Sequence, residues 1–367
     1  MKSLNNPYEE YPNRPKIIDL DSIPRIENFV DLIPPTFADL SESINKNTEL
    51  FNDFEAEKKQ MKPISGGVFV YYPADKKLVR FAPMFWHRLT LISRNSLLLR
   101  DPKMKKDWRE IRQIFESAVI AVAGCSVGGN IIHAIVQDLR PLHIKIADSK
   151  EFKISNANRV KITYKDIGQN KAFTVAEQIH AIDPFIKISV YHQGIGLNNS
   201  KKNIQHFING CPAIEEPKAT LIIDEIDDLK MKLEIRKEAR KAKIPVIMAT
   251  DIGSAVLLDI RRYDIDPLLP FAPDVADKKL EKLADEKDFY GFFKAIVGIK
   301  NLPDEFKSVL DEQPPLFNGA PQLGSTAMVA GGIAAEAAAR ILLGWKMPER
   351  IFFNKCTGKI RKGGKVL

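Results

Sequence analysis

Between residues 118 and 250 the chain alternates short apolar runs with segments of helical spacing. The runs are AVIAVA, HIKIAD, IKISVYH, TLIIDE and IPVIMAT, and helices are expected near residues 128–139, 168–181, 202–209 and 229–242. Continuously apolar strands joined by helical crossovers are typical of a parallel sheet that is covered on both faces. The pattern therefore predicts an α/β fold, with a Rossmann-like, mostly parallel sheet and helices on both faces.

A glycine-rich turn, Gly124-Cys125-Ser126-Val127-Gly128-Gly129, follows the first run directly and opens the first helix. Backbone N–H groups at such a helix N-terminus favour an anionic phosphate, and glycine lets the backbone approach it. Ser126 replaces the middle glycine of the dinucleotide-binding pattern. We expect its hydroxyl to contact phosphate, because no histidine partner for a nucleophile can be inferred nearby.

Asp148 ends the second apolar run, where an acidic side chain can accept hydrogen bonds from ribose hydroxyls. Together with the glycine turn it predicts a nucleotide site. These residues leave ATP, NAD and FAD open as ligands. They also leave open a purely structural turn and a strand-end aspartate.

Polar residues downstream of Asp148 favour ATP among these ligands. Residues 155–172 read SNANRVKITYKDIGQNKA and offer Asn156, Arg159 and Lys171 as donors for phosphate oxygens. A hydride-transfer enzyme does not break its pyrophosphate and needs no such set at this place. A salt-bridged loop is the alternative interpretation of the segment.

A carboxylate cluster, Asp224-Glu225-Ile226-Asp227-Asp228, follows the fourth apolar run. It should lie over the carboxyl edge of the sheet, where ligands bind in folds of this kind. Carboxylates that face phosphates imply a Mg²⁺ ion between them. The cluster therefore predicts Mg²⁺ as a cofactor beside ATP, with a salt-bridged loop again as the alternative.

At these residues the chain resembles the ThiF/MoeB/ubiquitin-activating-enzyme-like superfamily. Its members are ATP-dependent adenylyltransferases that activate ubiquitin-like proteins, sulfur-carrier proteins and some small carboxylates. The resemblance runs over residues 94–263 and more loosely to residue 343. It implies nucleotide-binding roles for Gly124, Gly128 and Gly129 of the turn, for Asp148 and for Asn156, beside the phosphate contact expected of Ser126.

The same resemblance implies catalytic and metal-binding residues. Arg159 falls in the S-N-x-x-R element, which contacts the phosphates, and Lys171 falls in the D-I-G-x-x-K-A element. Asp227 matches the magnesium-binding aspartate that follows the fourth strand. Arg94, in SRNSLLLRD, resembles the arginine that reaches across a homodimer into the partner's site. The resemblance therefore implies a homodimer with Arg159, Lys171 and Arg94 as catalytic residues.

Within the superfamily the chain is similar to ThiF-domain proteins that are often fused to a nitroreductase. VFVYYP and KLVRFAP upstream and PQLGS downstream carry that likeness. The chain also departs from the family. Lys150 stands where a second acidic residue is usual, and the two C-x-x-C pairs of many members are absent. No cysteine occurs between Cys211 and Cys356, where a thioester-forming cysteine would be expected, so we expect adenylation without a thioester step.

The organisation along the chain predicts three parts. Residues 1–62 are an N-terminal extension in which residues 36–59, after Pro34-Pro35, form one or two surface helices. Residues 63–117 hold a β-hairpin and a helical segment leading into the core. Residues 118–367 form the adenylation domain, with an insertion at about 264–320 and an alanine-rich helix at 326–343.

Composition narrows the compartment and the partners. No apolar run approaches the roughly 20 residues of a membrane span, and the N-terminus has charge and proline where a secretion signal would be apolar. Three cysteines far apart suit a reducing compartment, so we expect a cytoplasmic protein without a membrane partner. The net charge of +8 comes from lysines spread along the chain, which indicates a solvated basic surface rather than a nucleic-acid site.

The sequence thus predicts an ATP-dependent adenylyltransferase. A carboxylate, either the C-terminus of a ubiquitin-like or sulfur-carrier protein or a small acid, would become an acyl-adenylate with release of pyrophosphate. Two alternatives stay open. One is a dinucleotide-dependent oxidoreductase, and the other is a noncatalytic ATP-binding protein whose N-terminal region and insertion recognise a partner.

Overall fold

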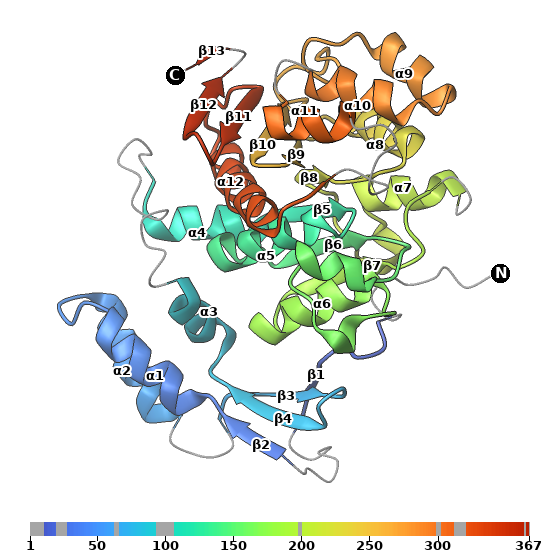
Figure 1. Cartoon of the computed structure of the whole chain (residues 1–367). Helices are drawn as coiled ribbons and strands as arrows, with labels where there is room; N and C mark the ends of the chain where they lie inside the picture. Colours follow the sequence, from blue (N-terminus) through green and yellow to red (C-terminus); the bar gives the residue numbers. More distant parts are fainter. Residues whose placement is uncertain are drawn as a thin grey trace.

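A computed structural model describes residues 11–19, 28–61, 66–92, 106–196, 200–298, 302–311, 321–362 and 365–366 (Figure 1). Its largest sheet has 9 strands in the order β13-β12-β11-β10-β9-β8-β5-β6-β7. The strands from β9 to β7 in this order are mutually parallel. They are β5 (Val119–Ala123), β6 (His143–Ala147), β7 (Lys187–Tyr191), β8 (Leu221–Asp224) and β9 (Val246–Ile252), which confirms the predicted parallel sheet.

Helical crossovers cover both faces of these strands, as the continuously apolar runs require. They are α5 (Val127–Leu139), α6 (Lys171–Ile182), α7 (Ser200–Asn209) and α8 (Leu229–Ala242). Alternate residues of each strand point to opposite faces. Ile120 and Val122 of β5 pack with α5 and α6, whereas Ala121 and Ala123 pack with α7 and α8.

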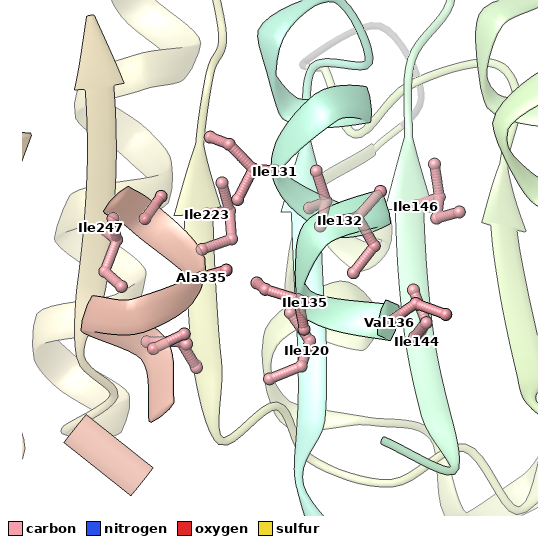
Figure 2. Close-up of a cluster of buried hydrophobic side chains, with 14 of the residues drawn as sticks. Ile120, Ile131, Ile132, Ile135, Val136, Ile144, Ile146, Ile223, Ile247 and Ala335 are labelled. Carbon is pink, nitrogen blue, oxygen red and sulfur yellow. The ribbon is translucent and has the colours of Figure 1, made fainter. Parts of the chain in front are cut away.

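One face carries the densest part of the core. Figure 2 shows isoleucine side chains of β5, β6, β8 and β9 directed towards Ile131, Ile132 and Ile135 of α5. Beside α5 lies the alanine-rich helix α12 (Gly324–Leu342), whose small side chains allow a close approach. A Cβ built on Gly331 of α12 would stand 3.0 Å from the carbonyl oxygen of Asn130, so the two helices touch at the backbone.

Antiparallel strands extend the sheet beyond β9. The mostly apolar run AVLLDIR forms a further strand, β10 (Ala255–Arg261), which pairs with β9. The C-terminal strands β11 (Arg350–Asn354), β12 (Lys359–Lys362) and β13 (Lys365–Val366) then pair in succession. The sequence did not predict these last strands, because KIRK and its neighbours lack the apolar alternation of a half-buried strand.

The insertion after β10 begins with turns over residues 264–276 and is then mainly helical in its described residues. It contains α9 (Asp277–Asp285), α10 (Phe289–Val297) and α11 (Asp304–Asp311). Phe271, Leu280 and Phe292 of this region pack against Leu233 of α8 and Met248 of β9. The insertion therefore lies over the α8 side of the sheet, at the top right of Figure 1.

The N-terminal region builds a second, 4-stranded sheet in the order β1-β3-β4-β2. Its strands are β1 (Lys16–Ile18), β2 (Asn28–Asp31), β3 (Val68–Tyr72) and β4 (Lys77–Phe81), and β3 and β4 form the predicted hairpin. Strands from both sides of residue 62 share this sheet. The helices of the region are α1 (Ile33–Ser43), α2 (Glu49–Gln60), α3 (Met84–Ile92) and α4 (Trp108–Ser117).

The helices α1 and α2 are not mere surface helices. Phe37, Leu40 and Phe54 are buried and pack with Trp86 of α3 in a small core of their own. α1 begins at Ile33, so the proline pair lies inside its first turn rather than before it. Proline is tolerated there because the first N–H groups of a helix have no intrahelical partner.

Buried polar contacts fasten the N-terminal region to the large sheet. The Arg88 guanidinium of α3 lies 2.8 Å from Asp183 and 3.2 Å from Glu116, and it also donates to the Arg140 carbonyl. The Tyr72 hydroxyl of β3 donates to the His180 carbonyl of α6 at 3.1 Å. None of the helices in the described ranges combines the length and apolar character needed to span a membrane.

Candidate functional site

A pocket of about 440 Å³ opens at the carboxyl ends of β5, β6 and β8. This edge is where ligands bind in open α/β sheets. The pocket is lined by residues 123–126, 147–150, 171, 193–196, 225–228, 230 and 231. Gly124, Ser126, Asp148, Lys171 and Asp227, which the sequence singled out, therefore meet in one cavity.

The glycine turn forms the wall of this pocket at the start of α5. Gly124 has a φ of +93°, and a Cβ there would stand 2.3 Å from the Glu225 carbonyl oxygen. Ser126 is the N-cap of α5, and its side chain makes no capping hydrogen bond. The first N–H groups of α5 and the Ser126 hydroxyl are thus the donors that the turn can direct to an anion.

Gly128 and Gly129 have a different role from Gly124. Both are buried within α5 and neither lines the pocket. A Cβ would lie 3.0 Å from Val122 at Gly128 and 3.4 Å from Val175 at Gly129. These two glycines therefore let α5 pack closely against β5 and α6, and so set the position of the turn.

Asp148 holds the glycine turn with one carboxylate oxygen. The Cys125 N–H donates to Oδ2 at 2.8 Å, and the Lys150 N–H donates to Oδ1 at 2.8 Å. Burial raises the pKa of the adjacent Cys125 thiol well above its ordinary value, which keeps that thiol neutral. The carboxylate of Asp148 thus fixes the loop geometry and still faces the pocket.

Lys171 supplies a buried positive charge. It is the first residue of α6, whose N-cap Asn170 accepts hydrogen bonds from Ala172 and Phe173. The Lys171 side chain is 7% exposed, and its ammonium lies 5.5 Å from the centre of the Phe152 ring. An ammonium in this position can attract phosphate oxygens at low solvent exposure.

The carboxylates after β8 do not act as one cluster, which corrects the prediction from the sequence. Asp224 is fully buried, 3.0 Å from the Lys232 ammonium and 2.7 Å from Arg236 Nε. Asp228 caps α8 by accepting from the Met231 N–H at 2.9 Å. Asp227 is well exposed and lies 3.2 Å from the Lys150 ammonium. Asp224 and Asp228 thus have partners within the β8–α8 unit, whereas Asp227 lines the pocket and its ion pair with Lys150 is exposed.

Glu225 lies at the floor of the pocket, beneath the glycine turn. Its Oε1 accepts a hydrogen bond from the Ala249 N–H of β9 at 2.7 Å. Burial raises the pKa of this carboxyl to about 8, against the partial opposing effect of Lys232. The side chain therefore ties β8 to β9 and carries little negative charge at neutral pH.

Asn156 and Arg159 lie on a neighbouring segment and do not line the pocket. Asn156 is buried in the short helix η4 (Ile154–Asn158), where its Oδ1 accepts from the Lys153 N–H at 2.9 Å. Arg159 Nη1 donates to the Asn158 side chain at 2.8 Å, while its Nε is buried without a hydrogen bond. Arg94 lies outside the described residues.

The segment before α12 contacts a carboxylate of β9, Asp251, that the sequence analysis did not single out. Gln322 donates to Asp251 Oδ1 at 2.9 Å, and Asp251 Oδ2 is buried without a hydrogen-bond partner. Burial raises the pKa of Asp251, against the opposing effects of Gln322 and Arg159. Gln322 belongs to the PQLGS element, whose recognition was the only signal in the sequence for this contact.

Comparison with known proteins places this architecture. A profile described as the ThiF family matches residues 104–361. The chain belongs to the ThiF family. MT1398, an uncharacterised protein of Mycobacterium tuberculosis (strain CDC 1551 / Oshkosh), is 28% identical to this ThiF-family chain over 280 residues. That match covers 75% of the chain but only 36% of MT1398, so the chain spans little more than a third of this relative.

Two solved structures are similar to this chain in fold. A crystal structure of PaaA has a TM-score of 0.52 at 15% identity and covers 95% of this chain and 98% of that chain. A crystal structure of E. coli MccB with AMPCPP and MccA has a TM-score of 0.51 at 16% identity, over 74% of this chain and 70% of that chain. At such identities the likeness concerns the fold, and for PaaA it extends over the N-terminal region.

Proposed function

We propose that this ThiF-family chain is an ATP-dependent adenylyltransferase that activates a carboxylate. One observation carries the proposal: the glycine turn, Asp148, Lys171 and Asp227 line a single pocket at the carboxyl edge of the sheet. In this proposal the turn and Lys171 would donate to phosphate, Asp148 would accept from ribose and Asp227 would bind a divalent cation, all from the lining of one cavity. The MccB structure with AMPCPP, an ATP analogue, supports ATP as the nucleotide.

In the proposed reaction a carboxylate oxygen of the substrate forms a bond to the α-phosphorus of ATP. The bond from that phosphorus to the bridging oxygen breaks, and pyrophosphate leaves with the electron pair. Such transfers depend on alignment and on stabilisation of negative charge more than on covalent catalysis. Lys171 and Arg159 would stabilise the phosphate charge, and Arg94 would reach the site from the partner in a homodimer.

Mg²⁺ fits the proposed site through Asp227. Within the described ranges there is no group of three or more His, Cys, Asp or Glu side chains arranged to hold a metal ion by themselves. A single exposed carboxylate suits Mg²⁺, which keeps several waters and is commonly bound by one or two carboxylates together with substrate phosphates. The ion would neutralise phosphate charge, while Asp148 would hold the ribose and Ser126 would donate to a phosphate.

The proposed chemistry ends at the acyl-adenylate. Cys125 and Cys211 are buried, and Cys356 is exposed in the turn between β11 and β12, away from the pocket lining. This supports adenylation without a thioester step. The proposed substrate is the C-terminus of a ubiquitin-like or sulfur-carrier protein, or a small acid. The proposed enzyme is a cytoplasmic homodimer. The MccB structure contains MccA beside the nucleotide analogue.

Exchange of radiolabelled pyrophosphate into ATP tests the proposal in the presence of Mg²⁺ and candidate carboxylates. We expect carboxylate-dependent exchange, and we expect Lys171→Met, which removes a positive charge from the pocket lining, to lower its rate about 100-fold, the usual cost of removing one donor to transition-state charge. Lys161→Met is the matched control, because Lys161 is exposed on the segment before α6 and outside the pocket lining.

The outcomes separate the alternatives. If ATP does not bind at millimolar concentration, the proposed function is wrong. If the purified protein is yellow or quenches NADH fluorescence, a dinucleotide-dependent oxidoreductase replaces it. If ATP binds but no candidate carboxylate supports exchange, and Lys171→Met changes only ATP binding, the chain is a noncatalytic ATP-binding protein.

A further inference from the structure

The pocket lining contains three lysines, Lys150, Lys171 and Lys230. Their ammonium groups make different contacts. The Lys171 ammonium is buried over the Phe152 ring. The Lys230 ammonium pairs with Asp285 of the helical insertion at 3.1 Å. The Lys150 ammonium instead lies 3.2 Å from Asp227 Oδ2, and both side chains are largely exposed. Lys150 is therefore the pocket cation in direct contact with the proposed metal ligand.

The backbone of Lys150 is fixed by the nucleotide site on both sides. Its N–H donates to Asp148 Oδ1 at 2.8 Å, and its carbonyl accepts from the Lys171 N–H at 2.9 Å. The proposed ribose and phosphate residues thus anchor the base of this side chain. Its ammonium is left to move on a flexible stem with 64% of the side chain exposed.

The contact between Lys150 and Asp227 is easily exchanged. An ion pair between two exposed side chains is worth about 0–1 kcal/mol, because water competes for both charges. A divalent cation that binds Asp227 competes with the ammonium for the same carboxylate, because two positive charges at this distance repel each other. The displaced ammonium then lies beside the phosphates that share the cation, and a triphosphate offers more negative charge than Asp227 did.

We propose that Lys150 is a phosphate-binding residue that Asp227 holds in place until the nucleotide and Mg²⁺ bind. This rests on the proposed function, since it takes the pocket to be a nucleotide site. It gives the lysine at this position a defined role, although the resemblance to the family leads one to expect an acidic residue there. The ligand it recognises is the polyphosphate part of the nucleotide, not the base or the ribose.

Lys150→Met tests this, because methionine keeps most of the apolar stem and removes the charge. ATP and adenosine are titrated separately against a fluorescent adenine nucleotide, with saturating Mg²⁺. We expect Lys150→Met to weaken ATP binding about tenfold, as the loss of one charge-assisted hydrogen bond does, and to leave adenosine binding unchanged. Lys165→Met removes an exposed lysine of the next segment and should change neither.

The requirement for the cation is the second readout. In Lys150→Met the Asp227 carboxylate is free of its ion pair, so half of the Mg²⁺-induced gain in ATP binding should occur at a lower Mg²⁺ concentration. In Asp227→Asn that gain should disappear. The Mg²⁺ midpoint thus tests the ion pair with Asp227, and the selective loss of ATP binding over adenosine binding tests the contact with phosphate.

The outcomes distinguish this inference from the proposed function. If the unaltered protein binds ATP and Lys150→Met weakens ATP and adenosine equally, or weakens neither, the role of Lys150 is wrong and the nucleotide site stands. If the unaltered protein binds neither ligand, the nucleotide site fails and the role of Lys150 fails with it.

Discussion

At the scale of single residues, the glycines of this chain differ in how strongly the backbone conformation and the neighbouring atoms require glycine. Gly124 combines a φ of +93° with a Cβ position only 2.3 Å from a backbone oxygen, and backbone cannot yield as a flexible side chain can. Gly332, on an exposed position of α12, has no atom within 4 Å of its Cβ position. The first therefore requires glycine for steric reasons, and the second does not.

We predict that Gly124→Ala lowers the free energy of unfolding by about 2–4 kcal/mol, through a left-handed backbone and a steric clash. Gly332→Ala should instead raise it by about 0.5–1 kcal/mol, because alanine restricts the unfolded chain and favours helix. Urea denaturation followed by circular dichroism measures both. Equal effects of the two substitutions would show that the turn is not constrained as described.

At the scale of secondary-structure elements, one buried carboxylate joins β8 to α8. Burial alone would raise the pKa of Asp224, but Lys232 and Arg236 reverse this and hold the pKa below its ordinary value. Arg236 also donates to the Phe271 carbonyl, so the contact extends to the segment before α9. The position of the end of β8 is thus fixed by two positive side chains of α8, Lys232 and Arg236.

Asp224→Asn should cost about 3–5 kcal/mol of unfolding free energy, because it leaves Lys232 and Arg236 without their anion in the interior. Asp285→Asn is the matched control, since it breaks the exposed pair with Lys230 between α9 and α8. That change should stay within about 1 kcal/mol. Thermal and urea unfolding of both variants measures the change in the free energy of unfolding. A loss of less than about 1 kcal/mol in Asp224→Asn would contradict the stabilising role of the buried ion pairs.

At the scale of the whole molecule, two histidines, His87 and His180, are buried where the N-terminal region packs against the large sheet, and burial favours their neutral forms. The His87 ring of α3 lies between Phe81 of β4 and Phe185, a residue of the segment between α6 and β7, with ring centres 5.1 and 5.6 Å away. Burial lowers the pKa of His87 to about 4, with Arg140 and Arg88 acting in the same direction and Asp183 opposing them. The pKa of His180, under Tyr11, is also lowered to about 4 by burial.

Stability should therefore fall in acid. Above the ordinary histidine pKa of 6.5 both states are neutral and the contribution is complete; as pH falls towards about 4, the unfolded chain binds protons that the folded chain resists. We predict that His87 contributes about 1–2 kcal/mol to the loss between pH 7.5 and 5. In His87→Phe that loss should shrink, with a remainder from His180, when urea denaturation is compared at the two pH values. An unchanged loss would exclude His87 as its source.

Much of this protein can be predicted from local sequence. The apolar runs of the parallel strands and the spacing of α5, α6 and α8 predicted the sheet, because burial on both faces leaves a local pattern. Gly124 and Asp148 could be placed at one pocket for the same reason: both follow directly from strand ends that a parallel sheet brings to one edge.

The tertiary structure decided which polar side chains remain available for a ligand. The local pattern from Asp224 to Asp228 does not distinguish its carboxylates, and only the family resemblance singled out Asp227. In the structure Asp224 pairs with Arg236 of α8, Asp228 caps α8, and Asp227 lies beside Lys150. Lys150 and Asp227 are 77 positions apart, and Gln322 and Asp251 are 71 apart. The pattern of buried and exposed positions in a helix or strand depends on neighbouring residues and can be seen in the sequence. The partner of a charged side chain depends instead on which distant segments the fold brings together.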